Sequence, residues 1–192
     1  MFRPNQLDVD RACVMVIDVQ EKLLPLIRGH EAIVASIRKL LDGVRVFELP
    51  LLATEQYRKG LGSTHPTVAE GLTANRAIVI EKPTFSACGE PTIRDALREM
   101  DRPLVLVCGI EAHVCVQQTA LDLRASGYDV FVCADAVGSR GRVDYEMALT
   151  RMGQEGVTVT TVESALFELC NRCDTQRFKA MLEVIKAHPP IA

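Results

Sequence analysis

The chain has 192 residues, of which 48% are hydrophobic and 24% charged, and its formal net charge is −3 with a pI near 5.8. This size and composition are typical of one globular domain, so we expect residues 1–192 to fold as a single unit. The acidic balance argues against nucleic acid as the main partner, and no apolar run reaches the roughly 18 residues that a membrane span needs.

The seven cysteines do not form the pattern of a disulfide framework. Their number is odd, and Cys13, Cys108 and Cys133 lie inside apolar runs that are typical of buried strands. Cys170 and Cys173 form a lone C-x-x-C motif without the two further ligands that zinc would need, so we expect them to serve packing. The amino terminus lacks the apolar core of a signal peptide, which predicts a cytoplasmic location.

Short apolar runs recur along the chain and predict strands. They are continuous and rich in β-branched residues, which is typical of strands covered on both faces in a parallel sheet. In chain order the runs are 12–17, 50–53, 77–80, 104–107, 130–132 and 157–159.

Helical patterns separate these runs. In chain order they are 31–48, 91–100, 114–125, 143–152 and 174–187. The alternation of strands and helices predicts an open, doubly wound α/β sheet with right-handed crossovers. The stretch from Thr54 to Leu72 is rich in glycine and polar residues, and we expect it to be a loop that borders the site. The last helix carries an apolar stripe that predicts an interface between copies of the chain.

Three ionisable residues are expected at one edge of this sheet. Asp18 ends the first apolar run, Lys82 follows the third and Cys115 follows the fourth. Sites in open α/β sheets form beyond the carboxyl ends of the strands, near the switch in strand order. A carboxylate, an amine and a thiol at that edge predict nucleophilic catalysis.

Cys115 is the predicted nucleophile. It opens a helical stretch six residues after Gly109, and the dipole at a helix N-terminus stabilises a thiolate. We expect Lys82 to lower the pKa of the Cys115 thiol further, and Asp18 to accept the thiol proton. Backbone N–H groups between residues 111 and 115 are expected to hold a developing oxyanion.

Neighbouring side chains receive lesser roles. Gln20 and Phe85 are expected to line the pocket, because each closely follows a predicted catalytic residue on a strand-end loop. Cys88 is the rival nucleophile, but no helix terminus is evident behind it. His113 is set aside as a base, since side chains two positions apart at a helix start point in different directions.

Three separated motifs together resemble those of the isochorismatase-like cysteine hydrolases. They are Val16-Ile17-Asp18-Val19-Gln20, Glu81-Lys82-Pro83-Thr84-Phe85-Ser86-Ala87 and Gly109-Ile110-Glu111-Ala112-His113-Val114-Cys115-Val116. The resemblance covers nearly the whole chain and implies a three-layer α/β/α fold around a six-stranded parallel sheet. It also implies a catalytic triad of Asp18, Lys82 and Cys115, and a cis peptide bond between Ile110 and Glu111.

Within that superfamily the chain is most similar to the isochorismatase-domain-containing subgroup. The assignment depends on residues 54–62, 109–115 and 178–182. Nicotinamidases of the superfamily carry an Asp-x-His-x-x-His metal site in the loop after the second strand. The corresponding loop of this chain has His65 as its only histidine, so we expect no metal and no cofactor.

The residue at the third position of the triad narrows the type of bond that the protein is expected to cleave. Isochorismate-cleaving members have glycine there, so Cys115 predicts acyl chemistry on a C–N bond of a small molecule, through a thioester. Ala112 replaces a threonine of many relatives, and Glu111 is expected to supply a carboxylate at the mouth of the pocket. Superfamily members are commonly closed oligomers, which implies a homo-oligomer. The alternative is a non-catalytic interaction or scaffold protein that keeps the hydrolase fold.

Overall fold

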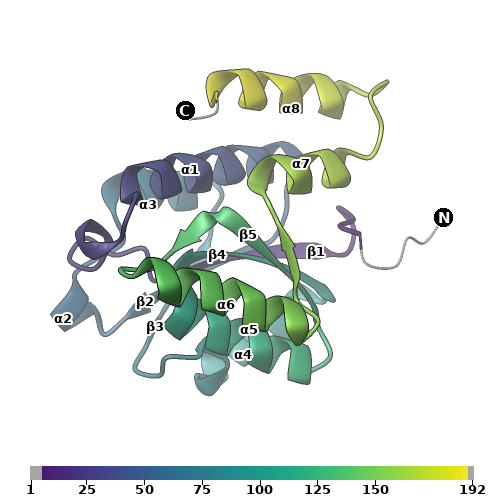
Figure 1. Ribbon diagram of the computed structural model, residues 1–192. Coiled ribbons are helices and arrows are strands. Elements are labelled where there is room, and N and C mark those ends of the chain that lie inside the picture. The colour runs from purple at the N-terminus through teal and green to yellow at the C-terminus, as the bar shows by residue number, and fades with distance from the viewer. Residues whose placement is uncertain (1–5, 190–192) are drawn as a thin grey trace.

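A six-stranded, all-parallel sheet forms the middle layer of the computed structural model, which describes residues 6–189 (Figure 1). Its strands are β1 (Ala12–Ile17), β2 (Leu51–Gln56), β3 (Ile78–Lys82), β4 (Leu104–Ile110), β5 (Asp129–Gly138) and β6 (Thr158–Thr160). Every predicted apolar run lies in or directly beside one of these strands. Residues 1–5, which carry most of the prediction about a signal peptide, lie outside the described part.

The strand order is β3-β2-β1-β4-β5-β6. The chain therefore winds from β1 to one edge, returns to the other side of β1 and continues to the opposite edge. The switch lies between β1 and β4, whose carboxyl ends are paired through Ile17 and Gly109. Because ligand sites form at such a switch, this crevice is where the predicted catalytic residues need to meet.

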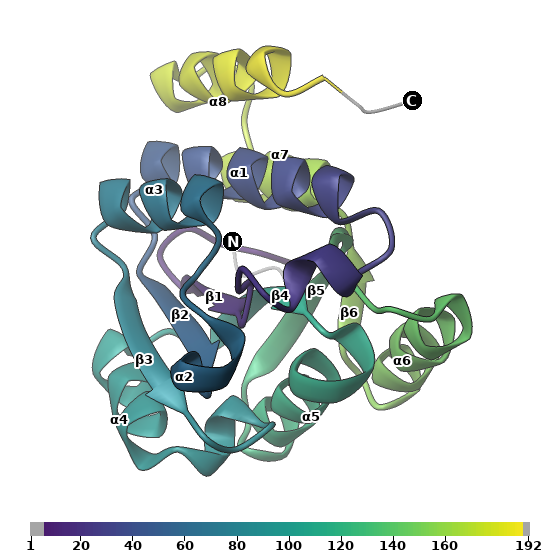
Figure 2. The ribbon, with the colours of Figure 1, turned by 90° about the vertical axis from the view of Figure 1, so that its left-hand side faces the viewer.

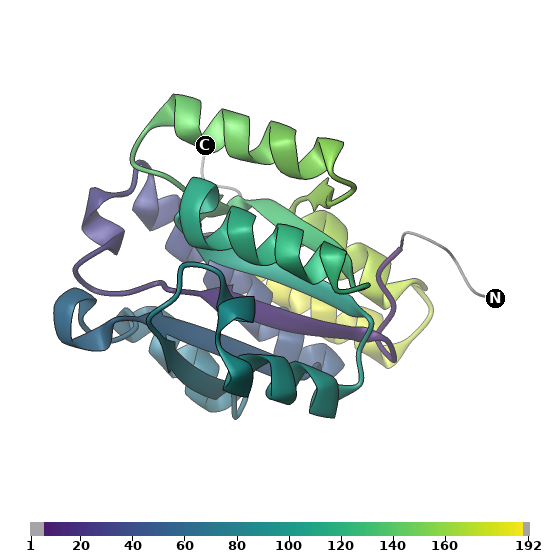
Figure 3. The same cartoon turned by 90° about the horizontal axis from the view of Figure 1, so that it is seen from below.

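Helices cover both faces of the sheet (Figures 1 and 2). One face carries α1 (His30–Phe47), α3 (Pro66–Ala74) and α7 (Val162–Cys170), with α8 (Gln176–Ala187) stacked outside α1 and α7. The other face carries α4 (Pro91–Met100), α5 (Gln117–Ala125) and α6 (Arg142–Gln154), which Figure 3 shows side by side. The short elements are η1 (Leu24–Leu26), α2 (Arg58–Leu61), η2 (Ala87–Gly89) and the π-helical turn η3 (Ala112–Val116). No helix of residues 6–189 is long and apolar enough to cross a membrane.

The two faces have separate apolar cores because successive side chains of a strand point to opposite faces. In β1, Val14 and Val16 join the core beneath α1, whereas Met15 and Ile17 join the core beneath α4 and α5. All six residues of β1 are buried, which explains its uninterrupted apolar sequence. The outer strand β3 differs from the prediction of two covered faces, since Ile78 and Val79 at this sheet edge are exposed.

Two segments of the sequence were interpreted incorrectly. The predicted loop at 54–72 contains the end of β2 followed by α2 and most of α3. Pro66 opens α3, and its buried Val68 and Leu72 are four residues apart on one helix face, a pattern too short to stand out among glycines and polar residues. The apolar stripe of α8, predicted as an interface, packs inside the chain, where Met181 joins the core beneath α1.

Gly109 permits the closest approach between β1 and β4. It has a φ of +119°, and a Cβ at this position would overlap the backbone carbonyl oxygen of Ile17. Backbone atoms cannot move aside as a flexible side chain can, so a glycine is required here. The carboxyl ends of β1 and β4 are thereby held together directly before the residues of the predicted site.

Candidate active site

Asp18 leaves β1 in the left-handed region, with a φ of 51°, a conformation that aspartate tolerates better than most residues. Its backbone N–H donates to the carbonyl oxygen of Thr54 at 3.1 Å. The Thr54 hydroxyl in turn donates to Asp18 Oδ1 at 2.7 Å. The carboxylate is completely buried, and β2 therefore fixes both its backbone and one of its oxygens.

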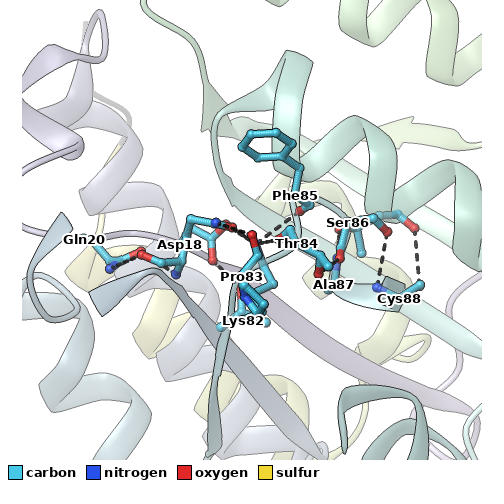
Figure 4. Close-up of polar contacts among 12 residues, drawn as sticks. Asp18, Gln20, Lys82, Pro83, Thr84, Phe85, Ser86, Ala87 and Cys88 are labelled. Atoms are coloured by element: carbon cyan, nitrogen blue, oxygen red, sulfur yellow. Dashed lines mark hydrogen bonds and ion pairs between the residues drawn. The ribbon is translucent and has the colours of Figure 1, made fainter. Parts of the chain in front are cut away.

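Lys82, the last residue of β3, reaches past β2 to Asp18 (Figure 4). Its Nζ lies 2.7 Å from Asp18 Oδ2, and both side chains are fully buried. The same nitrogen donates to Gln56 Oε1 at 2.8 Å and to the carbonyl oxygens of Thr84 and Phe85, each at 3.1 Å. An ammonium group has three donors, so these four acceptors satisfy it completely and hold it in place.

Cys115 completes the cluster from the other side of the switch. It lies in the π-helical turn η3 between β4 and α5, a type of turn that occurs frequently at functional sites. Cys115 is 5% exposed, and its thiol lies close enough to Asp18 and Lys82 for the charges of both to shift its pKa. The structure thus brings together the carboxylate, the amine and the thiol that the sequence predicts at this edge.

The electrostatics of Cys115 differ from the prediction. Burial and then the charge of Asp18 raise the pKa of its thiol to about 12, and the opposing effect of Lys82 is smaller. Lys82 thus acts in the predicted direction, but burial and then Asp18 outweigh it, so the pKa of Cys115 rises overall. The resting group is a neutral thiol beside a buried carboxylate, which is the arrangement of a nucleophile and its general base.

This environment predicts the pH dependence of Cys115 alkylation. Between about pH 7 and pH 10 we expect the iodoacetamide rate to rise roughly tenfold per pH unit, because the thiolate fraction rises tenfold per unit below the pKa. Peptide mass spectrometry would measure the rate, with the exposed Cys173 as a reference for the reagent. A plateau near neutral pH would instead show that Cys115 rests as a thiolate paired with Lys82.

The peptide bond between Ile110 and Glu111 is cis, at the position that the resemblance implies. The Glu111 carboxylate is buried and accepts from the Arg140 backbone N–H at 3.2 Å and from Arg140 Nε at 3.0 Å. Glu111 is therefore not the open carboxylate at the pocket mouth that the sequence predicts. Its own carbonyl oxygen accepts from the N–H groups of Val114 and Val116, at 3.1 and 3.2 Å. The N–H groups of Glu111, Ala112, His113 and Cys115 remain as the candidates for holding an oxyanion.

Gln20 and Phe85, the two predicted pocket residues, have different surroundings. Gln20 is fully buried, and its side-chain amide donates to the carbonyl oxygens of Gln56 and Gly62 at 3.0 and 2.6 Å. Its Oε1 accepts from the Gln56 backbone N–H at 2.7 Å. These bonds fasten the segment after β2. A substrate contact by Gln20 stays a prediction. The Phe85 ring is 57% exposed and points away from Lys82 (Figure 4).

His113 and Cys88, the alternative base and nucleophile, make their contacts outside the cluster of Asp18, Lys82 and Cys115. His113 Nδ1 lies 2.9 Å from the Ser139 hydroxyl. Cys88 Sγ lies 4.0 Å from the Thr119 carbonyl oxygen, and burial raises the pKa of the Cys88 thiol to about 11. Within residues 6–189, no three side chains of His, Cys, Asp or Glu gather as a metal-binding group.

Thr54 and Gln56 are site residues that the sequence analysis did not identify. They are two positions apart on β2, so both side chains lie on the same face of the strand. One donates to Asp18 and the other accepts from Lys82, which makes β2 the bridge between the two charges. The sequence does carry an indication of this pair, since two polar residues two positions apart follow the apolar run 50–53. The prediction of a loop over residues 54–72 obscured it.

Comparison with known proteins identifies the family. The model of the isochorismatase domain matches residues 12–164 of the chain. The chain belongs to the isochorismatase-like hydrolase family. Isochorismatase domain-containing protein 1 of Salmo salar is 40% identical over 175 residues, covering 90% of this chain and 60% of that protein. The chain thus spans about 60% of the length of that relative.

Two further relatives match over nearly their whole length. Isochorismatase domain-containing protein 2 of Danio rerio is 37% identical over 187 residues, with coverage of 96% of this chain and 91% of that protein. The secreted isochorismatase effector Isc1 of Phytophthora sojae is 37% identical over 188 residues, covering 97% and 90%. These relatives place the chain among the isochorismatase-domain-containing proteins.

Three solved structures match the fold. The MAR1 ribonuclease of Caenorhabditis elegans is 37% identical with a TM-score of 0.90, covering 96% of this chain and 94% of that one. YcaC of Escherichia coli, described as an octameric hydrolase of unknown specificity, is 25% identical with a TM-score of 0.92, covering 99% and 94%. YcaC of Pseudomonas aeruginosa, solved with covalent acrylamide, is 27% identical with a TM-score of 0.88, covering 98% and 96%. The predicted three-layer α/β/α fold is confirmed.

Proposed function

We propose that this protein is a cysteine hydrolase that cleaves an amide-like C–N bond of a small molecule. Cys115 serves as the nucleophile, Asp18 as the general base and acid, and Lys82 as the cation that positions the carboxylate. The observation that carries the proposal is the fully buried Lys82–Asp18 ion pair of 2.7 Å beside the Cys115 thiol, whose pKa is shifted by both charges. Burying two charges costs desolvation free energy, and a buried ion pair seldom adds stability in return. Its presence here favours a functional role.

The reaction proceeds through two acyl transfers. Asp18 takes the thiol proton while Cys115 Sγ forms a C–S bond with the substrate carbonyl carbon, and the carbonyl oxygen becomes an oxyanion. The tetrahedral intermediate breaks its C–N bond, and the leaving nitrogen receives the proton from Asp18. Water then attacks the thioester and gives a proton to Asp18. The C–S bond breaks, the acid is released and the sulfur recovers its proton from Asp18.

The thiol itself favours chemistry at a carbonyl carbon. A neutral thiol with an adjacent base becomes a strong nucleophile only as it loses its proton, which suits an acyl group held against it. The P. aeruginosa YcaC, whose structure contains covalent acrylamide, supports a reactive nucleophile in this fold. Backbone N–H groups of Glu111, Ala112, His113 and Cys115 are the proposed oxyanion donors, and one such donor typically contributes about 3 kcal/mol.

The burial of the site favours a small substrate. Asp18 and Lys82 are fully buried and Cys115 is 5% exposed, so little of the cluster is accessible to a large substrate. The C. elegans relative is named a ribonuclease, which makes RNA the competing substrate class. The net charge of −3 and the depth of the thiol favour a small amide over a polyanion.

A substrate panel tests the proposal. We expect the purified protein to release ammonia from at least one member of a set of small amides, ureides and nicotinamide, and to leave a fluorescently quenched RNA oligonucleotide intact. Coupled glutamate dehydrogenase would measure the ammonia, and fluorescence the RNA. Cleavage of RNA that survives Cys115→Ala, with no ammonia from any amide, would contradict both the nucleophile and the bond.

The proposal also covers the domain organisation, cofactor requirement, assembly and cellular compartment of the enzyme. Residues 1–192 act as one hydrolase domain without a metal or other cofactor, and its copies form a homo-oligomer. The octameric E. coli relative supports assembly, as do the exposed apolar side chains of Val143 and Met147 on α6, which are 69% and 55% exposed. All seven cysteines are free, which favours a reducing compartment such as the cytoplasm.

A further inference from the structure

A groove between α4 and α5 lies apart from the proposed catalytic cluster. It encloses about 530 Å³ and runs from Cys88 to the segments that precede β4 and β5, including Pro103 and Tyr128. It therefore opens at the amino ends of these strands, the opposite sheet edge from Asp18 and Cys115. The two helices lie side by side on this face of the molecule (Figures 1 and 3).

The groove is lined by an excess of positive charge. Arg94 and Arg98 are four residues apart on α4, and Arg102 follows Asp101, whose left-handed backbone ends the helix; Asp101 is the one carboxylate among the lining residues. This local excess of two positive charges contrasts with the net charge of −3 of the chain. Because all three guanidinium-bearing residues line the same groove, they can approach one ligand together.

The three guanidinium groups differ in the hydrogen bonds and ion pairs that they already make within the chain. Arg94 donates to the Cys88 carbonyl oxygen, and Arg98 pairs with Asp95 at 2.7 Å. Arg102 is half-buried and has neither a hydrogen bond nor an ion pair with any residue of 6–189. A half-buried guanidinium with five free donors, facing an open groove, has the properties of an anion-binding group.

The remainder of the groove suits an apolar body. Leu97 and Leu123 are buried in its walls, and the half-buried ring of Tyr128 forms part of the lining. The Tyr128 hydroxyl has no hydrogen-bond partner within the described residues. Burial raises the pKa of Tyr128, so the hydroxyl remains a donor at neutral pH.

We propose that this groove is a binding site for a small organic anion, with Arg102 and Arg98 holding a phosphate or carboxylate group and Leu97, Leu123 and the Tyr128 ring holding an apolar body. The Tyr128 hydroxyl supplies a further hydrogen bond to the anion. Planar guanidinium groups bind oxyanions with paired hydrogen bonds, which explains the preference for this head group.

Calorimetry with simple probes tests the site. We expect phenyl phosphate to bind one molecule per chain, inorganic phosphate to bind more weakly and the neutral benzyl alcohol not to bind; benzoate shows whether a carboxylate is accepted. Arg102→Gln should weaken phenyl phosphate binding by about tenfold or more, the effect of losing a charged hydrogen bond. Arg45→Gln, which removes the same charge from an exposed position on α1, should leave binding unchanged.

A second measurement does not depend on a groove variant. Cys88 lines the groove and Cys173 is exposed elsewhere, so bound phenyl phosphate should slow the alkylation of Cys88 and leave that of Cys173 unaffected. Cys115→Ala should bind phenyl phosphate as the parent does, which separates this site from the proposed catalytic function. Absence of binding, equal weakening by Arg45→Gln, or unchanged Cys88 labelling would overturn the assignment.

Discussion

Replacing Cys115 by alanine is expected to lower substrate hydrolysis by about 10⁴-fold or more while the protein remains folded. The thiol forms the covalent intermediate in the proposed mechanism, and loss of a nucleophile leaves only the weak effects of binding and oxyanion stabilisation. The side chain is small, so its truncation should lower the free energy of unfolding by only about 1 kcal/mol. Steady-state ammonia release and thermal unfolding would measure the two effects separately.

Cys88→Ala is the matched control for this experiment. Cys88 is the rival cysteine, half-buried on η2, and its thiol has a raised pKa of about 11 without an adjacent carboxylate in hydrogen-bond contact. We expect Cys88→Ala to keep nearly the full rate. The reverse pattern would transfer the nucleophile to Cys88. Full activity in both variants would exclude a thioester mechanism, and a cellular effect that survives Cys115→Ala would favour the scaffold alternative.

Replacing Lys82 by methionine is expected to destabilise the protein by about 3–5 kcal/mol. The substitution keeps much of the side-chain volume but leaves the Asp18 carboxylate fully buried without its cation, and an uncompensated buried charge carries a penalty of this size. It also leaves Gln56 Oε1 and two backbone carbonyl oxygens without their donor. For a chain of this length, the melting temperature should fall by about 10 °C.

Two comparisons isolate the buried pair as the cause. Lys186→Met removes an exposed lysine that pairs with Glu183 on α8, and should change stability little. The double substitution Lys82→Met with Asp18→Asn removes both charges, so it should be more stable than Lys82→Met alone. Urea unfolding of the parent, Lys82→Met, Asp18→Asn and the double variant would give the coupling free energy. If Lys82→Met is as stable as Lys186→Met, the ion pair does not hold the site together.

The positions of the three central residues were predictable from local sequence. Asp18, Lys82 and Cys115 each follow an apolar run, and parallel strands bring the ends of such runs to one edge. The sheet was predictable for the same reason, because strands buried on both faces leave a continuous apolar signal in the sequence. Helices with little apolar patterning, such as α3, left a much weaker signal.

The surroundings of these residues depend on contacts between distant segments, which no local pattern records. The raised pKa of Cys115 follows from its burial and from Asp18, which also neutralises Lys82. The carboxylate of Glu111 is engaged because Arg140, 29 positions later, folds back onto it. Gln20 was expected to meet the substrate, but its amide binds the backbone of the segment after β2.

The absence of a side chain at Gly109 has a consequence for how the catalytic distances are maintained. Asp18 directly follows Ile17 of β1, and Cys115 lies in the turn after β4. The distance between the Asp18 carboxylate and the Cys115 sulfur therefore depends on how closely the backbones of β1 and β4 approach each other. Even a methyl group at Gly109 would act as a wedge between β1 and β4. The distance over which the proposed proton transfer takes place is thus set by a glycine that takes no part in the reaction.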